Sequence, residues 1–361
     1  MGSNMENNHD EYDVSLHALL LASAQLYPAV LNAAIELNLF KIIGEGSPKG
    51  MSPTEIASKL PNPRDNMAGR LDRLLFLLAS HSVLTCSSSN KVDDDGRTER
   101  LYALSPAGKY MFPNEVEASY ASVSNLCNHP AYVKVLGNIK QIILDEEEDL
   151  FKKVHGMSMY EYMKRNPTME TLFHKAASDF SFMHMTQILE KYKGFEGIST
   201  LVDVAGGIGQ CLKMIVSKYP SIQGINFDLP HVVQRAPSHP RVKYVGGDMF
   251  QSVPEGDAIM MKATTHNWAD DKCIQVLKNC HNSLKKGGKL IIIDLIMPEM
   301  PNETDSHKHA AIADNYMFLL AGGKERTEKE FEALGKAAGF SIYRVAARLF
   351  SSSLGVIEFY K

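Results

Sequence analysis

The sequence predicts an α/β protein in which a helical half precedes a half built on a mostly parallel sheet. Apolar residues recur mostly at helical spacing up to about residue 195. From about residue 199, short apolar runs of strand length alternate with helical segments. Such alternation is typical of a parallel sheet covered by helices on both faces. A chain of 361 residues is long enough for two domains of ordinary size.

Composition limits the kinds of partner that we expect. The formal net charge of -4 gives no basic bias towards nucleic acid. No apolar run approaches the ~18 residues of a membrane-spanning helix, and the polar first residues are unlike a signal peptide. The five cysteines are odd in number and form no CxxC pair, which indicates free thiols and a cytoplasmic protein. We therefore expect no nucleic acid, membrane or metal among its partners.

Three helices are predicted first. Residues 16–43 are apolar at helical spacing, and Pro28 marks a break or a first turn there. A short helix follows, with Ser52 suited to its N-cap and Pro53 to its first position. Residues 67–80 form the third predicted helix.

A β-hairpin is predicted next, from strand-like residues 83–87 and 100–105. Helices followed by a hairpin give the order of a winged helix, which raises the possibility of DNA binding. The candidate recognition helix offers only Arg70 and Arg73, however, and residues 93–95 of the hairpin are acidic. The long first helix is too apolar all round to face water, so a dimerisation module is favoured.

The second half alternates strands with helices such as residues 271–284. Its strand candidates are residues 200–205, 224–229, 242–245, 257–263 and 289–296. Two further strand-like runs near the end, 340–350 and 352–361, predict a terminal antiparallel hairpin, which belongs to the class I methyltransferase fold. The predicted domains are a winged-helix-like dimerisation domain at 1–115, a helical linker contributing to the substrate pocket at 116–195, and the sheet domain at 196–361.

The stretch TLVDVAGGIGQ, residues 200–210, carries a glycine-rich turn between a strand and a helix. A dinucleotide site requires G-x-G-x-x-G, but Leu212 stands where the third glycine is expected. A nucleoside cofactor without phosphates needs only close approach to the backbone, which Gly206, Gly207 and Gly209 permit.

Three acids at successive strand ends help to identify the cofactor. Asp203 closes the first strand, Asp228 closes the second, and Asp248 with Met249 follows the third. Asp228 can bridge two ribose hydroxyls, and Asp248 can accept a hydrogen bond from an adenine amino group. Three acids suit a cationic sulfonium nucleoside and would repel a pyrophosphate, which indicates S-adenosylmethionine (SAM). The alternative is that all three only cap turns.

The sequence resembles the plant SAM-dependent small-molecule O-methyltransferases, most closely the chalcone-methylating members from legumes. The stretches that carry the resemblance include YPAVLNAAIELNLFKII, SKYPSIQGINFDLP, VGGDMFQSVPEGDA, HNWADDKC and GGKERTEKEFE, and together they span nearly the whole chain. The resemblance implies a homodimer that converts SAM to S-adenosylhomocysteine. The expected cofactor-binding residues are Asp203, Ala205, Gly206, Gly207, Asp228, Leu229, Asp248, Met249, Phe250 and Lys262.

A phenol, with a pKa near ~10, is a weak nucleophile at neutral pH, so methyl transfer benefits from a base. His266 follows a predicted strand and lies at the cofactor edge of the sheet. The resemblance implies that His266 is this base and that Asp294 and Glu325 flank and orient it. The expected reaction is O-methylation of a phenolic hydroxyl on a chalcone, flavonoid-like or phenylpropanoid molecule.

The substrate pocket is expected to have methionine and aromatic walls, which suit a flat phenolic ring. The expected substrate-binding residues are Asn128, Phe180, Met183, Trp268 and Asn315. Asn128 matches a family position that can hydrogen-bond an oxygen substituent. Phe180 stands where caffeic-acid-type members have a histidine, which favours a less polar substrate.

Two residues depart from the family pattern. Ala205 replaces the first glycine of the family's DVGGG turn, so we expect weaker SAM binding. Thr265 replaces the cysteine that precedes the catalytic histidine in chalcone-type members. These departures leave an alternative open, in which the fold no longer methylates and instead binds a ligand or uses His266 for cyclisation or dehydration.

Overall fold

The computed structural model describes residues 14–92, 98–112, 118–144, 149–349 and 353–361. The chain divides into two compact units. One comprises Met1–Pro130 with Thr171–Phe180, and the other comprises Ala131–Glu170 with Ser181–Lys361. The acidic residues 93–95 of the expected hairpin lie outside the described residues.

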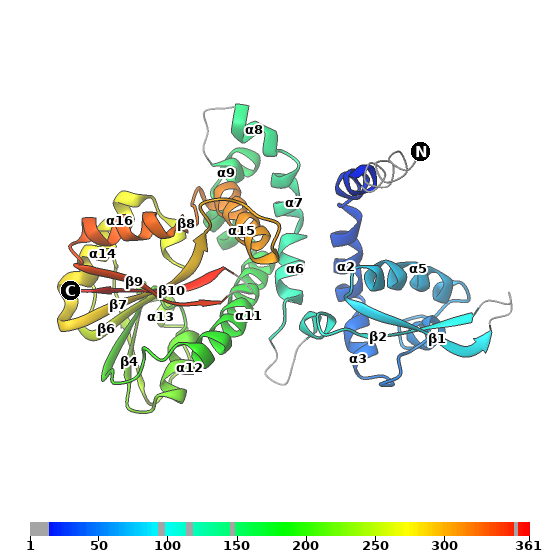
Figure 1. Cartoon of the computed structure of the whole chain (residues 1–361), viewed down its shortest axis with the longest axis horizontal. Coiled ribbons are helices and arrows are strands. Elements are labelled where there is room, and N and C mark those ends of the chain that lie inside the picture. Colours follow the sequence, from blue (N-terminus) through cyan, green and yellow to red (C-terminus); the bar gives the residue numbers. More distant parts are fainter. Residues whose placement is uncertain (1–13, 93–97, 113–117, 145–148, 350–352) are drawn as a thin grey trace, which may run out of the picture. The chain divides into compact units, whose positions relative to one another are not determined.

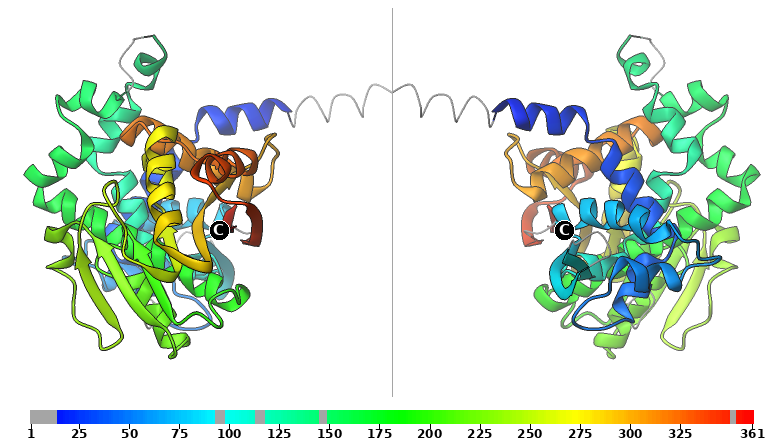
Figure 2. Two further views of the ribbon diagram at one scale, coloured as in Figure 1. Left: turned by 90° about the vertical axis from the view of Figure 1, so that its left-hand side faces the viewer. Right: turned by 90° about the vertical axis from the view of Figure 1, so that its right-hand side faces the viewer.

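The first unit contains helices and one hairpin. Its elements are a helix over Val14–Ala22, α2 (Leu26–Glu36), α3 (Leu39–Gly44), α4 (Pro53–Ser58), α5 (Met67–Ser80), β1 (Leu84–Val92), β2 (Thr98–Leu104), η1 (Gly108–Met111) and α6 (Ala121–Cys127). Strands β1 and β2 pair antiparallel. Helices α2 and α5 (blue) pack on each other, as the right-hand view of Figure 2 shows.

The helical stretch predicted over residues 16–43, with a break or a first turn at Pro28, is divided into three helices by two breaks. The first break lies between Val14–Ala22 and α2, and the second follows α2 at Asn38, whose φ of 55° is left-handed. A left-handed residue cannot continue an α-helix, and asparagine adopts this conformation more readily than most residues. Pro28 falls in the first turn of α2, where its missing N–H costs nothing.

The short helix α4 begins as the sequence predicts. Ser52 caps it by accepting a hydrogen bond from the backbone N–H of Glu55, and the Glu55 carboxylate accepts one from the N–H of Ser52. The buried ring of Tyr102, on β2, ties the hairpin to α5 through a hydrogen bond of 2.7 Å from its hydroxyl to Asp72.

Five helices follow α6 along the chain, before the first strand of the sheet. They are α7 (Pro130–Leu136), α8 (Ile139–Leu144), α9 (Leu150–His155), α10 (Met159–Arg165) and α11 (Pro167–Lys191). No single described helix has both the length and the apolar composition to cross a membrane. The helices over Val14–Ala22 and Leu26–Glu36 reach that composition only as a pair, with a bend of 52° between them.

The second unit is a sandwich of helices around one sheet, with strand order β5-β4-β3-β6-β7-β10-β9 (Figure 1). The strands are β3 (Thr200–Val204), β4 (Gln223–Asp228), β5 (Val242–Gly246), β6 (Gly256–Lys262), β7 (Leu284–Met297), β8 (Arg326–Thr327), β9 (Ile342–Leu349) and β10 (Leu354–Tyr360). β10 pairs antiparallel with both β7 and β9, and the strands from β5 to β7 are parallel. The class I methyltransferase fold is therefore confirmed.

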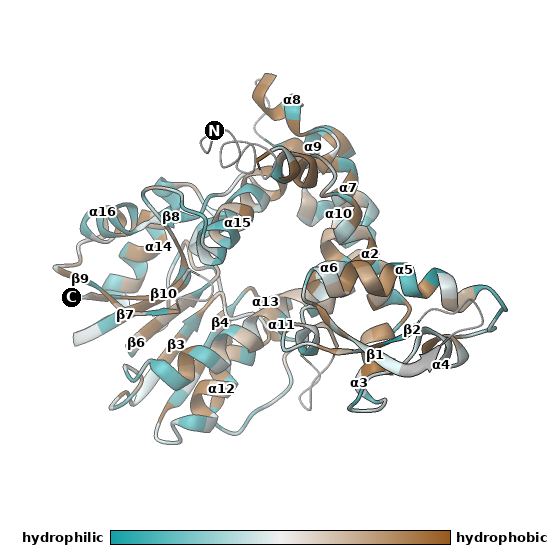
Figure 3. Ribbon diagram, turned by 45° about the vertical axis from the view of Figure 1, so that its right-hand side comes forward, coloured by the Kyte–Doolittle hydropathy of each residue, from teal (hydrophilic) through white to brown (hydrophobic). Residues whose placement is uncertain are grey.

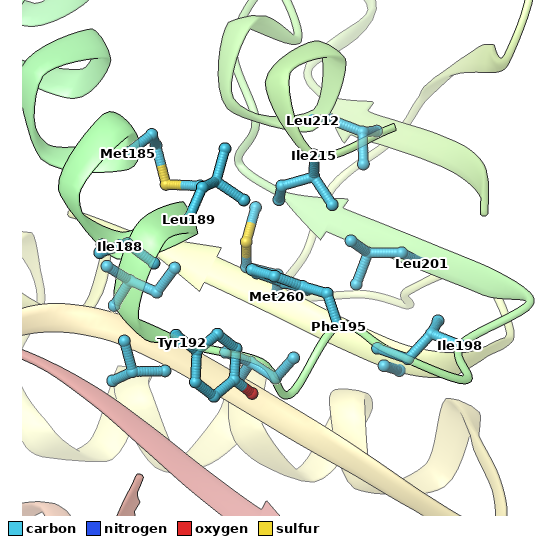
Figure 4. Close-up of a cluster of buried hydrophobic side chains, with 14 of the residues drawn as sticks. Met185, Ile188, Leu189, Tyr192, Phe195, Ile198, Leu201, Leu212, Ile215 and Met260 are labelled. Atoms are coloured by element: carbon cyan, nitrogen blue, oxygen red, sulfur yellow. The ribbon is translucent and has the colours of Figure 1, made fainter. Parts of the chain in front are cut away.

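Alternate residues of each central strand face different helices. The helices are α12 (Gln210–Lys218), α13 (Pro230–Val233), α14 (Asp270–Ser283), α15 (Asp305–Ala321) and α16 (Glu328–Ala338). Leu201 and Met260 pack with α11 and α12, as Figure 4 shows, whereas Val202 and Met261 pack with α14 and α16. The central strands are hydrophobic and the outward sides of α12 and α16 hydrophilic (Figure 3). Successive side chains of the central strands therefore point to opposite faces of the sheet, and both faces are covered by helices.

A buried carboxylate stabilises the sheet away from its glycine-rich end. Glu358, on β10, is fully buried and accepts hydrogen bonds from Lys289 (2.6 Å), Tyr192 (2.5 Å) and Arg344 (2.6 Å). Burial alone would raise the pKa of Glu358, but hydrogen bonds from Lys289, Tyr192 and Tyr360 outweigh it and lower the pKa to about 2.

We expect Glu358→Gln to lower the free energy of unfolding by about 3–5 kcal/mol, because it leaves the mostly buried Lys289 without its counter-charge. Since the folded-state pKa is depressed, the contribution is complete above the ordinary glutamate pKa of ~4.3 and is lost as pH falls towards about 2. Urea unfolding at pH 7 and at pH 3 measures both effects. An equal free energy for variant and wild type at pH 7 would contradict the prediction.

Candidate functional site

The glycine-rich turn between β3 and α12 is held in an unusual backbone conformation. Ala205, Gly207 and Gly209 all have positive φ, of 58°, 57° and 80°. A Cβ on Gly206 would lie 2.3 Å from Oδ1 of Asn226, so packing excludes a side chain there. A Cβ on Gly207 would meet no atom within 4 Å. The turn therefore presents bare backbone to open space at Gly207.

Side chains of the neighbouring strand β4 fix this turn. The carboxylate of Asp228 accepts hydrogen bonds from the N–H groups of Gly207 (2.8 Å) and Leu229 (2.7 Å). Nδ2 of Asn226 donates to the carbonyl of Gly207 at 2.8 Å. Asp228 thus lies at the carboxyl end of its strand, facing the turn.

Two buried acceptor atoms beneath the turn have no hydrogen-bond partner among the described residues. They are Oδ2 of Asp203 and Oδ1 of Asn226. Burial raises the pKa of Asp203 to about 7, while the positive charge of Lys262 opposes this rise. Nζ of Lys262 donates to the Ser181 hydroxyl at 3.0 Å. Unpaired buried acceptors are costly, so this place favours a ligand that brings donors or positive charge.

The loop after β5 forms a third wall. Asp248 is exposed and accepts a hydrogen bond of 2.9 Å from the N–H of Phe250. Side-chain amides of α14 donate hydrogen bonds to the carbonyls of Met249 and Phe250. The Phe250 ring packs edge-on against Trp268, with centroids 4.9 Å apart.

His266 lies on η2 (Thr265–Asn267), a short turn after β6, between two buried acids. Its Nδ1 is 2.8 Å from Oε1 of Glu325 and 3.9 Å from Oδ1 of Asp294. Asp294 comes from β7, which runs on to Met297 and pairs there with β8. The structure therefore brings together the three side chains that the sequence singled out.

Charges around the imidazole determine its proton affinity. Burial alone would lower the pKa of His266, but the charges of Asp294 and Glu325 and the hydrogen bond to Glu325 outweigh it, and the pKa is raised. Lys262 opposes this rise. Burial in turn raises the pKa of Glu325. Such a ring can hold a proton through Nδ1 while its other nitrogen, Nε2, accepts one.

The ligand atoms of His266, Asp294 and Glu325 all lie within 4.8 Å of one another, a spacing that also suits a metal ion. We interpret the set as a hydrogen-bonded triad, because Nδ1 of His266 already lies at hydrogen-bond distance from Glu325. The absence of a metal from the reaction stays a prediction.

Comparison with known proteins identifies the class of enzyme. Residues 137–341 match the O-methyltransferase domain family, and residues 19–114 match the O-methyltransferase dimerisation domain. Caffeic acid 3-O-methyltransferase from Catharanthus roseus is 46% identical over 92% of this chain and 91% of that protein. Flavonoid 3'-O-methyltransferase from Chrysosplenium americanum is 44% identical over 96% of this chain and 98% of that protein. The chain belongs to the plant O-methyltransferase family.

Solved structures agree with this identification. CalO1, a methyltransferase of calicheamicin biosynthesis in its SAH-bound form, has a TM-score of 0.79 to this chain and 26% identity, over 96% of this chain and 98% of CalO1. This O-methyltransferase is SAM-dependent, as the sequence predicts. The family findings favour methyl transfer over the alternative of a fold that no longer methylates. The dimerisation domain supports a homodimer and offers no reason to assign DNA binding.

The residues of this O-methyltransferase fit a sulfonium nucleoside. The bare backbone at Gly207 allows close approach, and Asp228 lies beside it. The unpaired oxygens of Asp203 and Asn226 can accept hydrogen bonds from a charged amino group. Leu229 is half exposed at the same strand end.

The residues predicted to bind substrate are less informative in this O-methyltransferase. Met183 is buried in α11, and Trp268 is 38% exposed beside Phe250. Asn315 is exposed on α15, and its Nδ2 donates to a carbonyl of its own helix. Asn128 and Phe180 belong to the first unit. The roles of all five towards a substrate stay predictions.

Sequence reasoning missed several residues around the triad of this O-methyltransferase. Asp314 accepts a hydrogen bond of 2.8 Å from the N–H of Glu325, and the Thr265 hydroxyl donates to Asp294. Arg326 is buried and binds the turn that carries His266. The one sequence signal for Arg326 is that this charged residue directly follows a predicted catalytic acid. The sequence marks Thr265 only as a departure from the family pattern.

We expect Ala205→Gly to stabilise this O-methyltransferase. A non-glycine residue at a φ of 58° is strained by about 1–2 kcal/mol, and glycine removes that strain. The free energy of unfolding should therefore rise by about 1 kcal/mol. SAM should bind about tenfold more tightly if the Ala205 methyl group crowds the cofactor, since a misplaced methyl costs about 1–3 kcal/mol.

Urea unfolding and calorimetric titration with SAM separate the two effects. Ala→Gly at Ala269, which caps α14 at a φ of -63°, is the matched control and should not stabilise. A gain in stability with unchanged SAM affinity would mean that the Ala205 methyl group points away from the cofactor. No gain in either quantity contradicts the prediction.

Proposed function

We propose that this enzyme transfers the methyl group of SAM to a phenolic hydroxyl of a flavonoid-like or phenylpropanoid small molecule, with His266 as the general base. The main support is the contact of 2.8 Å between Nδ1 of His266 and Glu325, which leaves Nε2 for a substrate hydroxyl. The relatives named for caffeic acid and for a flavonoid support a phenolic substrate. We also propose a cytoplasmic location, because the cysteines are free thiols.

The proposed chemistry needs a base that is matched to a phenol. Bound SAM supplies a methyl group on a positively charged sulfur. Nε2 of His266 accepts the phenolic proton while the oxygen attacks. Glu325 accepts a hydrogen bond from Nδ1–H, which keeps Nε2 available, and its negative charge stabilises the imidazolium that forms. Asp294 adds a second negative charge at 3.9 Å.

We assign the cofactor contacts on the same basis. Asp228 would bind the ribose hydroxyls, and Asp248 the adenine amino group with Met249 packed on the ring. Asp203, Ala205, Gly206 and Gly207 would contact the methionine portion through the turn, with Leu229, Phe250 and Lys262 completing the wall. The two buried acceptors without partners support this assignment of the turn.

The proposed function is tested by incubating purified protein with SAM and a panel of phenols that includes caffeic acid, a chalcone and a flavonoid. Mass spectrometry should find a mono-methylated product and S-adenosylhomocysteine in equal amounts. A panel of aliphatic alcohols is the control and should remain unmethylated. SAM binding without methylation of any phenol would contradict the proposal.

We expect the helix over Val14–Ala22 to contribute to dimerisation. The side chains of Leu19, Leu20 and Leu21 are 63%, 59% and 65% exposed. Together they present a large apolar surface to water. Burying each leucine stabilises by about 1.5–3 kcal/mol, so Leu19→Glu with Leu20→Glu should raise the dimer dissociation constant by at least about a hundredfold. Sedimentation velocity measures this change.

Ile342→Glu is the matched control, because Ile342 is an equally exposed apolar residue (58%) on the edge strand β9. This variant should remain dimeric. A fully dimeric double-glutamate variant at micromolar concentration would show that the helix over Val14–Ala22 does not hold the two copies together.

A further inference from the structure

Arg326 is the largest fully buried side chain among the described residues, with 1% of its surface exposed. Its NH1 donates to the carbonyl of Thr265 at 2.7 Å, and its NH2 donates to the carbonyl of Trp268, also at 2.7 Å. Nε and NH2 both bind Oδ1 of Asp270, at 3.1 and 2.7 Å. One guanidinium therefore holds the backbone on both sides of His266.

Residues just before Arg326 contact the same turn. The N–H of Lys324 donates to the carbonyl of His266 at 3.0 Å. A Cβ on Gly323 would lie 2.1 Å from that carbonyl, so the two backbones touch. Glu325 holds the imidazole itself. The segment 323–326 thus contacts the ring of His266, its carbonyl and the carbonyls of its neighbours.

The chemistry of this contact is specific to arginine. Burying a guanidinium costs several kcal/mol unless it is fully paired, and an apolar side chain could fill the same space. A planar guanidinium offers donors at fixed spacing, so it can hold two carbonyls and a carboxylate in one geometry. Such a group is suited to fixing the position of a turn.

We propose that Arg326 is a positioning residue for methyl transfer, whose guanidinium holds the turn Thr265–Trp268 so that His266 stays against Glu325. This inference rests on the proposed role of His266 as the base. Arg326 does not touch the substrate in this proposal and acts only through the turn. A misplacement of about 1 Å at a reacting group can lower turnover about a hundredfold.

Arg326→Met removes the charge and keeps the length of the side chain. We expect kcat to fall by about 10–100-fold, with the SAM dissociation constant within threefold of wild type. The acid limb of the kcat–pH profile should also move to lower pH, because a ring that leaves Glu325 loses part of what raises its pKa. Asp294, Glu325 and Lys262 are the charged groups around the ring, and Arg326→Met leaves all three in the sequence.

Lys289→Met is the matched control. Lys289 is also a mostly buried cation in an ion pair, with Glu358, but it lies towards the beginning of β7, away from His266. This variant should lose stability and keep kcat and its pH profile. Arg326→Lys should recover only part of kcat, because an ammonium cannot reproduce the planar arrangement of donors.

Asp270→Asn tests the inference if Arg326→Met does not fold. Asp270 is half exposed, so we expect the protein to fold without its charge. We expect its kcat to fall about three- to tenfold with SAM affinity unchanged. A wild-type kcat and pH profile in a folded Arg326→Met protein would overturn the inference, as would a wild-type kcat in Asp270→Asn when Arg326→Met is unfolded.

The double variant His266→Gln with Arg326→Met distinguishes this inference from the proposed function. If Arg326 acts through His266, the double variant should be no slower than His266→Gln alone. Full additivity of the two losses would overturn the inference and leave the base assignment intact. Unchanged turnover in His266→Gln alone would instead overturn the proposed function.

Discussion

His266→Gln is expected to lower kcat by about 10²–10⁴-fold, the usual contribution of a general base. Glutamine can still hydrogen-bond to Glu325, so the turn should keep its structure and SAM should bind as in the wild type. The side chain is mostly buried, with 16% exposed, and a substitution of similar size limits the change in packing. Steady-state kinetics with the best phenol and calorimetry with SAM measure the two effects.

The pH profile gives an independent check of His266. A base is inactive once it is protonated, and the raised pKa of His266 places the acid limb of kcat above the ordinary histidine pKa of ~6.5. His266→Gln should lose this limb. His281→Gln, on the last turn of α14, is the control and should keep both kcat and the limb. Unchanged turnover in His266→Gln would show that another group takes the proton.

Asp228→Ala is expected to weaken SAM binding by about 10²–10⁴-fold. Hydrogen bonds to a charged group contribute about 1.5–3 kcal/mol each, and the variant would lose two to the ribose. It would also release the N–H groups of Gly207 and Leu229, which the carboxylate now holds. Calorimetric titration with SAM measures the loss, and kcat at saturating SAM should remain near that of the wild type.

Two further variants sharpen this prediction. Asp228→Asn keeps one acceptor oxygen and should weaken SAM by only about tenfold, or about 1.4 kcal/mol. Asp257→Ala is the control, because Asp257 also accepts a backbone hydrogen bond, from Thr200 at 2.8 Å, but at the opposite end of β3. Equal SAM affinity in Asp228→Ala and Asp257→Ala would remove Asp228 from the cofactor site.

Local sequence signals predicted the regular elements well. The strands of the sheet lie where apolar runs predicted them, with β7 longer at its beginning than expected. Ser52 and Pro53 start α4 because capping is a local property. The break at Asn38 could not be read from apolar spacing, since spacing is blind to a single left-handed residue. For the same reason Ala205 could be recognised as a departure, but not as a strained residue.

The candidate site was predicted where each residue follows a strand. His266, Asp294 and Asp228 lie on or directly after strands, and parallel strands bring such residues to one edge. Arg326 escaped prediction because charged residues are usually exposed, and its burial depends on carbonyls that are distant in sequence. Contacts of this kind exist only after the loops have folded together.

The position of β10 has a consequence for how the enzyme folds while it is being synthesised. β10 is the last strand along the chain, yet it lies between β7 and β9, and its Gly355 pairs with Asp294. A ribosome delivers residues in order, so β7 must wait with one edge unpaired until β10 emerges. The strand that carries Asp294, one of the two carboxylates beside the proposed base, therefore gains its second neighbour only from residues translated later. We expect nascent chains that end before β10 to be inactive and to expose an edge that a chaperone can bind.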